Sequence, residues 1–234
     1  MPQQYISLGC DIARSGQSAF CVLAGVDWRV RMIHLSSIAS VTAPEVEAML
    51  VSVAMRYEPH VIVLESNGPG AMFADFVAKN QPGLALATVD TSLPATLLPL
   101  WGSLELSAKE ILNIRTEMHW IVRLLLRDQR LTFDKEDEEL FAQLSSMTWD
   151  YDRIRGDRIA LISKRNLRLP HGSELEVEPF SRSPDKADAL ALAALGYAAL
   201  QQRDLPATAE IEEDIIQPEF EGFYDIGRAG IFEA

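Results

Sequence analysis

The chain has 234 residues, of which 48% are hydrophobic, and a formal net charge of −13. This length fits one sizeable α/β domain, or one domain with an appendage. No apolar stretch is long enough to cross a membrane, and the start, MPQQYISLGCDIA, lacks the basic and apolar regions of a signal peptide. The two cysteines, Cys10 and Cys21, give neither a disulfide framework nor a cysteine-rich zinc pattern, so we expect a reducing cytoplasm.

The charge is unevenly distributed along the chain. Residues 203–234 hold nine acids and two basic residues, so this acidic tail carries −7 of the net −13. Residues 153–168, RIRGDRIALISKRNLR, instead hold six basic residues and one acid. Local charge governs the binding of a polyanion more than the total does. The acidic total therefore does not exclude a nucleic-acid substrate.

The first half of the chain alternates strand-like and helical patterns. Strands are expected over residues 5–12, 19–26, 30–38, 60–64 and 84–89. Short turns join the first three, which should form an antiparallel meander, whereas HVIVL at 60–64 is continuously apolar, as in a buried parallel strand. Helical spacing is expected over residues 43–57, with Thr42 as a cap, and over 71–79.

The second half is mainly helical. Helices are expected over residues 107–128, 136–145 and 183–200, with a short strand at 131–133 and a hairpin at 149–163. This order predicts an α/β fold with a mixed sheet, three antiparallel strands followed by parallel strands, and helices on both faces. We expect the folded domain to span 1–202 and the acidic tail, 203–234, to be partly mobile. The tail has a few apolar residues through which it could dock, namely Phe220, Phe223, Tyr224, Ile231 and Phe232.

Acidic residues stand at the ends of several apolar elements. Asp11 lies on the first strand, Glu65 closes VIVLE, and Asp185 and Asp188 flank the start of the last helix. Asp188 opens a run without another charge up to Leu200, where an ionised group is costly. Because the carboxyl ends of parallel strands open into a ligand-binding crevice, we expect these acids to converge.

A convergent set of carboxylates needs a counter-ion, since like charges held close together cannot all stay ionised. Oxygen ligands without His or Cys favour Mg²⁺ or Mn²⁺ over zinc, and two such ions can clamp the attacking and leaving oxygens of a phosphodiester. Each acid alone also has a plainer interpretation. Asp11 could form a turn, Glu65 could cap the SNGPG loop, and Asp185 could complement the helix dipole. The strand-Asp, strand-Glu, helix-Asp order is more specific than any one member.

Four segments carry a resemblance to a known family: GCDIARSGQSAFCVLAG, VIVLESNGPG, NIRTEMHWIVRLLLRDQRL and SPDKADALALA. In this order they resemble the nuclease domain of the large terminase subunit of tailed bacteriophages, a member of the RNase H-like group, over residues 5–200. The third segment is similar to the family's Asn-(Lys/Ile)-Arg-x-Glu-Met-x-Trp pattern, and the fourth to its Ser-Pro-Asp-x-x-Asp-Ala signature. Residues 165–182 are longer than the family pattern.

The resemblance implies an endonuclease that uses two Mg²⁺ or Mn²⁺ ions to cut concatemeric phage DNA during genome packaging in the host cytoplasm. It implies that Asp11 bridges both ions, that Glu65 and Asp188 each hold one, and that Asp185 supports the site. It also implies double-stranded DNA, the packaging ATPase domain, the small terminase subunit and the portal as partners. The chain has no G-x-x-x-x-G-K-[ST] phosphate loop, so we expect an excised or separately encoded nuclease domain without the motor.

Basic residues around the expected hairpin are the candidates for DNA contact, with Lys164 nearest the crevice by analogy. The full set is Arg153, Arg155, Arg158, Lys164, Arg165 and Arg168. Their plainer interpretation is a solvated hairpin of mixed charge. In the long helix, Arg115 could pair with an internal acid, and Met118 and Trp120 should pack. The four histidines have no metal-pair spacing, so we assign none of them as a ligand.

Other functions remain open at this stage. A Holliday-junction resolvase shares the acid order and would nick branched DNA preferentially. A sugar-kinase-like or actin-like phosphotransferase also has an Asp before its first hairpin, but 234 residues leave too little chain for a second nucleotide-binding half. A non-catalytic module that binds DNA or the portal would not need all four carboxylates.

Overall fold

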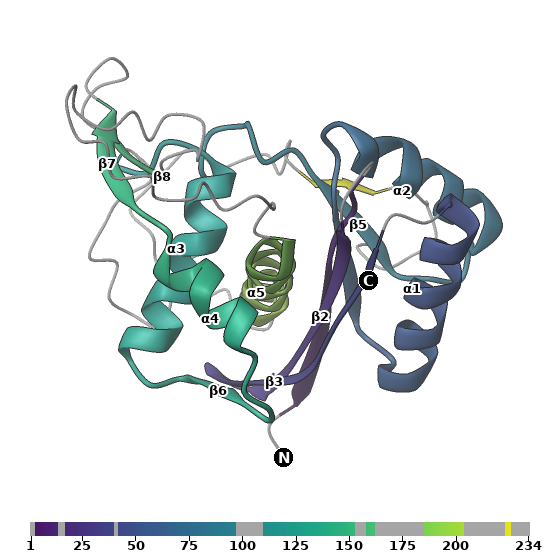
Figure 1. The fold of residues 1–234 in the computed structure, drawn as a ribbon, viewed down its shortest axis with the longest axis horizontal. Coiled ribbons are helices and arrows are strands. Elements are labelled where there is room, and N and C mark those ends of the chain that lie inside the picture. The colour runs from purple at the N-terminus through teal and green to yellow at the C-terminus, as the bar shows by residue number, and fades with distance from the viewer. Residues whose placement is uncertain are drawn as a thin grey trace.

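A mixed β-sheet forms the centre of the molecule in the computed structural model, which describes residues 3–13, 17–39, 42–96, 110–152, 158–161, 185–203 and 223–225. Within these ranges, seven strands form one sheet in the order β6-β3-β2-β1-β4-β5-β9. Helices cover both faces of this sheet (Figure 1). The predicted α/β fold class, a mixed sheet of antiparallel and then parallel strands with helices on both faces, is confirmed.

The strands follow the predicted order closely. The antiparallel meander consists of β1 (Gln4–Asp11), β2 (Gln17–Val26) and β3 (Arg29–Ala39). On one side, β4 (Val61–Glu65) runs parallel to β1, and β5 (Leu86–Val89) runs parallel to β4. On the other side, β6 (Leu131–Phe133) runs parallel to β3. The central strands are almost wholly buried, as expected for strands covered on two faces.

Helices divide the molecule into three layers. One face of the sheet carries α1 (Ala43–Tyr57) and α2 (Pro69–Asn80), and the other carries α3 (Ile114–Arg127), α4 (Glu138–Ser145) and α5 (Asp185–Arg203) (Figure 1). A two-stranded hairpin, β7 (Trp149–Asp152) and β8 (Arg158–Leu161), lies beside α3. None of the described helices combines the length and the apolar content needed to cross a bilayer.

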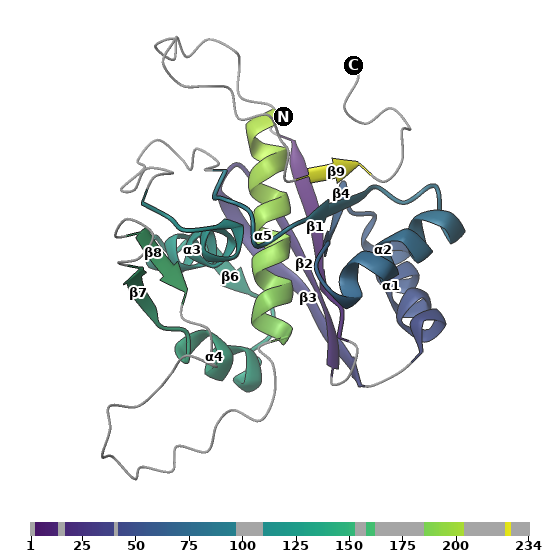
Figure 2. The same cartoon turned by 90° about the horizontal axis from the view of Figure 1, so that it is seen from above.

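Side chains alternate between the two faces of each strand and so fill two separate cores. On β1, Leu8 and Cys10 belong to the core under α1 and α2, whereas Tyr5 belongs to the core under α3, α4 and α5. Cys10 and Cys21 lie on neighbouring strands but in different cores, and both are free and buried. Most of α5 is buried between the sheet and α3, and it runs along β1 (Figure 2).

Two helices begin later than the sequence predicts. We expected a helix over 107–128, but residues 110–113 are not helical and α3 begins at Ile114. The reason is Asn113, whose side-chain oxygen accepts from the backbone N–H of Thr116 at 3.0 Å and so caps the helix. Likewise α4 begins at Glu138 and not at 136, because the Asp137 carboxylate accepts from the backbone N–H of Leu140 at 2.8 Å.

One short piece of the acidic tail belongs to the sheet. The strand β9 (Phe223–Asp225) pairs antiparallel with β5, with Tyr224 opposite Thr88. Phe223 and Tyr224, two of the expected docking residues, thus lie on a strand whose backbone pairs with β5. The other expected docking residues, Phe220, Ile231 and Phe232, lie outside the described residues, and the boundary at residue 202 stays a prediction.

Candidate functional site

Asp11 and Glu65 lie at neighbouring positions at one end of the sheet. They end the parallel strands β1 and β4, whose register pairs Cys10 with Leu64. Because side chains alternate along a strand, Asp11 shares a face with Gly9, and Glu65 shares a face with Val63. Both of these residues lie against α5. The two carboxylates therefore face the layer that contains Asp185 and Asp188.

Gly9 allows the backbone of α5 to lie directly on β1. A Cβ atom at this position would be 2.2 Å from both the carbonyl oxygen of Ala189 and the backbone nitrogen of Ala193. No side chain fits there, so the close approach depends on glycine. Ala189 follows Asp188 directly, and Gly9 precedes Asp11 by two positions. The contact therefore places the first turn of α5 beside the end of β1.

The charges of the other three predicted carboxylates all act on Asp11. Burial raises the pKa of Asp11 well above its usual value, and the charges of Asp188, Asp185 and Glu65 raise it further, in that order of importance. The Arg115 guanidinium opposes these effects. Repulsion of this kind is expected where several carboxylates share one site without a compensating cation.

Glu65 is held by the loop that follows β5. The hydroxyl of Thr91 donates a short hydrogen bond to its Oε1 atom, and the Asn67 amide donates to the same hydroxyl at 3.3 Å. Burial raises the pKa of Glu65, while the Thr91 hydrogen bond lowers it and the charge of Asp188 raises it. The carbonyl of Thr91 also accepts from the backbone N–H of Arg115 at 3.0 Å. The loop thus connects Glu65 to the first turn of α3.

Asp188 is held by two side chains of α3. The His119 Nε2 atom lies 2.8 Å from its Oδ1 atom, and the Arg115 Nη2 atom lies 3.7 Å from its Oδ2 atom. His119 is 2% exposed, whereas the Arg115 side chain is 44% exposed. The possible pairing of Arg115 with an internal acid is confirmed. The contact of His119 was not predicted, because the spacing between histidines in the sequence does not indicate a histidine that contacts a carboxylate.

The motif at the start of α3 builds the wall of the site. Beyond the Asn113 cap and the Arg115 ion pair, the buried Glu117 carboxylate accepts from the backbone N–H of Thr96 at 2.8 Å. Met118 is buried in the core, and the Trp120 ring packs edge-on against Trp149 at 5.1 Å. The predicted packing roles of Met118 and Trp120 are confirmed. Of the other motif residues, Asn113 caps the start of α3, and Glu117 binds the segment that ends at Thr96.

The first turn of α5 is anchored by α4. The Gln143 side-chain oxygen accepts from the buried backbone N–H of Ala187 at 3.0 Å, and Lys186 forms ion pairs with Asp137 at 2.7 Å and Glu139 at 2.9 Å. These contacts hold Asp185, which is 6% exposed, and Asp188 on either side of Lys186. The predicted cap, Ser183, and Pro184 lie outside the described residues.

The donor set of this site fits a hard cation. The charged groups that raise the pKa of Asp11 are all carboxylates, and carboxylate oxygens are the ligands that Mg²⁺ and Mn²⁺ prefer. In the described part of the chain, no three His, Cys, Asp or Glu side chains are arranged as a ready-made metal cluster. Oδ1 of Asp188 contacts His119, and Oδ2 lies 3.7 Å from Arg115. Metal binding would therefore require the Arg115 side chain and the other carboxylates to adjust, whereas the backbone and the His119 contact are already in place.

The predicted DNA-contact residues are only partly described. Arg158 lies on β8, whereas Arg153, Arg155, Lys164, Arg165 and Arg168 lie outside the described residues. The hairpin is tied to the start of α3 by hydrogen bonds from Leu112 N–H to the Ile159 carbonyl at 2.9 Å and from Leu161 N–H to the Thr116 hydroxyl at 3.2 Å. It is thus attached one turn from Arg115, at the same end of α3 as the carboxylates.

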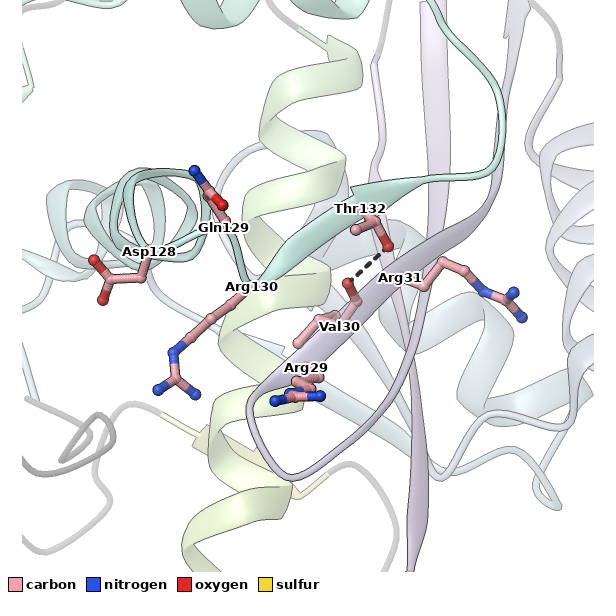
Figure 3. A pocket seen from close by; sticks show the side chains of 7 residues that line it. All are labelled: Arg29, Val30, Arg31, Asp128, Gln129, Arg130 and Thr132. Atoms are coloured by element: carbon pink, nitrogen blue, oxygen red, sulfur yellow. Dashed lines mark hydrogen bonds between the residues drawn. The ribbon is translucent and has the colours of Figure 1, made fainter.

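A pocket of about 510 Å³ lies elsewhere, between the start of β3 and the end of α3. Its lining includes Arg29, Arg31 and Arg130, and Figure 3 shows the guanidinium groups of Arg29 and Arg130 on the same side of it. The register places Val30 level with Gly25 and Tyr5, at the opposite end of β1 from Asp11. This separation is roughly 20 Å along the strand, so the pocket is distinct from the carboxylate site.

Comparison with known proteins identifies structural relatives only. No protein-family model and no curated protein sequence matches the chain. Among solved structures, the nuclease domain of the large terminase subunit gp2 of bacterial virus Sf6 aligns with a TM-score of 0.61 and 17% identity, covering 83% of this chain and 89% of that chain. The chain shares the fold of phage large terminase nucleases.

Two further matches contain divalent metals. A mutant of the Sf6 domain with manganese aligns with a TM-score of 0.59 and 17% identity, covering 81% of this chain and 88% of that chain. The large terminase nuclease from thermophilic phage G20c with bound magnesium aligns with a TM-score of 0.53 and 16% identity, covering 83% of this chain and 82% of that chain. The likeness agrees with the resemblance drawn from the sequence motifs.

Proposed function

We propose that this chain is a metal-dependent endonuclease that cuts concatemeric double-stranded phage DNA during genome packaging. The observation that carries the proposal is that Glu65 on β4 and Asp185 and Asp188 on α5 lie near enough to Asp11 on β1 for their charges to raise its pKa. A protein maintains such repulsion at a functional site more often than in a passive core. The terminase nuclease fold supports the same activity, since the related domains from Sf6 and G20c are nucleases.

The four acids are proposed to hold two Mg²⁺ or Mn²⁺ ions. Asp11, Glu65 and Asp188 would hold the ions, with Asp185 in support, and the pKa of Asp11 responds to the charges of all three other acids. When bound, such ions supply positive charge to the attacking and leaving oxygens of a phosphodiester. The Thr91 hydroxyl fixes the Glu65 carboxylate, and the half-exposed Arg115 offers a cation to a DNA phosphate at the rim.

DNA is proposed to lie along the hairpin and the adjoining basic segment. The attachment of β8 to the first turn of α3 brings Arg158 to the same region as Arg115. The packaging ATPase domain, the small terminase subunit and the portal are proposed partners in the host cytoplasm, as in the related packaging machines. These partners rest on the family resemblance alone.

The test is cleavage of plasmid DNA by Asp11→Asn in the presence of Mg²⁺ or Mn²⁺. We expect the wild-type chain to linearise the plasmid and the variant to show no more cleavage than the wild type with a chelator. Asp134→Asn is the matched control, because it removes an exposed carboxylate that pairs with Arg31 at the opposite end of the sheet. Wild-type cleavage by Asp11→Asn would overturn the proposal. Preferential nicking of a four-way junction over linear duplex would favour a resolvase.

A further inference from the structure

His119 of α3 makes a direct hydrogen bond to one of the four carboxylates. Its Nε2 atom lies 2.8 Å from Oδ1 of Asp188, 69 residues away in the sequence. The imidazole is 2% exposed and lies between α3 and α5. Its other nitrogen, Nδ1, is buried and has no hydrogen-bond partner among the described residues. Among the described residues, the ring therefore makes one hydrogen bond, from Nε2 to Asp188.

The direction of this hydrogen bond follows from the chemistry of the two groups. A carboxylate can only accept, so the Nε2 atom must carry the proton. A buried N–H at Nδ1 would have no acceptor among the described residues, whereas a bare lone pair there leaves no donor unsatisfied. The geometry thus makes Nε2 the donor to Asp188 and leaves Nδ1 without a proton to donate.

We propose that His119 is a positioning residue that fixes the Asp188 carboxylate for cation binding at the site proposed above. It holds Oδ1 with a direct hydrogen bond, whereas Oδ2 has, among the described residues, the 3.7 Å contact with the half-exposed Arg115. That longer contact exceeds hydrogen-bond distance. Oδ2 is therefore the Asp188 oxygen that a cation could bind in place of Arg115. Outer partners of this kind fix the orientation of metal ligands and govern metal affinity.

The inference rests on the proposed function but makes a separate claim. A histidine that only satisfies a buried polar atom would affect folding and leave cation affinity unchanged. A positioning histidine must affect the affinity of the folded protein, and a replacement that restores the donor must restore the affinity. The side chain of glutamine is suited to this rescue, because its amide nitrogen is as many bonds from Cβ as Nε2 of histidine.

The experiment compares Mn²⁺ binding by calorimetry in the full chain with His119→Phe, His119→Gln, Asp188→Ala and Val122→Ala. We expect His119→Phe to weaken Mn²⁺ binding by about 10- to 100-fold, His119→Gln to recover most of it, and Asp188→Ala to lose a binding event. Val122 lies one turn along the same buried face and contacts the core. Its truncation is the control for lost stability, and we expect it to retain wild-type affinity.

Wild-type affinity in His119→Phe together with a loss in Asp188→Ala would overturn the positioning role and leave the proposed function standing. A wild-type chain that neither binds Mn²⁺ at millimolar concentration nor cleaves DNA would overturn both. If His119→Phe does not fold, the histidine tautomer in the wild type is read from ¹H–¹⁵N nuclear magnetic resonance spectra. A proton on Nε2 before and after addition of Mg²⁺ supports the proposal, and a proton only on Nδ1 refutes it.

Discussion

Replacing Gly9 with alanine tests how the closeness of β1 and α5 builds the site. The added Cβ would lie 2.2 Å from two backbone atoms of α5, whereas ordinary contacts begin at 3.4 Å, so the helix must retreat by about 1.2 Å. Backbone atoms of a buried helix cannot rotate out of the way. Overpacking of this kind costs about 1–3 kcal/mol, and we expect Gly9→Ala to lie at the upper limit, near 3 kcal/mol.

The same retreat would carry Asp185 and Asp188 away from Asp11. A misplacement of about 1 Å can lower an enzymatic rate by roughly 100-fold, so we expect a loss of DNA cleavage larger than the loss of folded protein. Urea denaturation gives the unfolding free energy, and plasmid cleavage below the transition gives the rate. Gly83→Ala is the control, since nothing lies within 4 Å of a Cβ there. Unchanged stability and cleavage in Gly9→Ala would refute the reasoning.

Three other predictions use ordinary solution measurements. Because the pKa of Asp11 is raised, the folded state binds the Asp11 proton more tightly than the unfolded state does. The contribution of Asp11 to stability is therefore lost as the pH rises from the usual titration range of an aspartate through the raised pKa. The unfolding free energy of Asp11→Asn minus that of the wild type should therefore grow with pH over this window in chelator, and a flat difference would contradict it. Asp137→Ala should lower the unfolding free energy by about 1–2 kcal/mol, since it removes both the α4 cap and an ion pair to Lys186. Glu139→Ala removes only an ion pair and should cost less than about 1 kcal/mol. Equal losses in urea denaturation would refute the distinction. Burial raises the pKa of both Cys10 and Cys21, so thiol reagents monitored by mass spectrometry should modify neither until the protein unfolds, and rapid labelling in buffer would contradict their burial.

The order of the strands along the chain and the bounds of α1 were predictable because their signals are local. The helix α1 has the predicted bounds, and the Glu45 carboxylate accepts a hydrogen bond from the backbone N–H of the Thr42 cap at 2.9 Å. The start of α3 was wrong because apolar spacing continues through Ile111, which pairs with Ile159 of β8 and not with helical neighbours. Periodicity cannot distinguish a buried extended residue from a helical one.

The site was predictable to the level of elements but not of side-chain contacts. Acids at the ends of β1 and β4 predicted a shared edge, which the register of the two strands confirms. The role of Asp188 as a metal ligand stays a prediction. The hydrogen bond from His119 to Asp188 depends on the packing of α3 against α5, which no local pattern contains. Its one sequence signal is the four-residue spacing from Arg115, which puts both side chains on one face of α3.

The tight packing of α5 explains why the repulsion among the carboxylates has to be relieved by positive charge and not by movement of the helix. Gly9 and Gly196 bring the helix backbone against the sheet, and Gln143 ties down the N–H of Ala187 in its first turn. The helix that carries Asp185 and Asp188 is therefore too tightly packed to move away from Asp11 and relieve the repulsion. Arg115 supplies part of the compensation, yet the pKa of Asp11 stays raised. A bound divalent cation would complete it, so cation binding should stabilise the fold as well as equip the site.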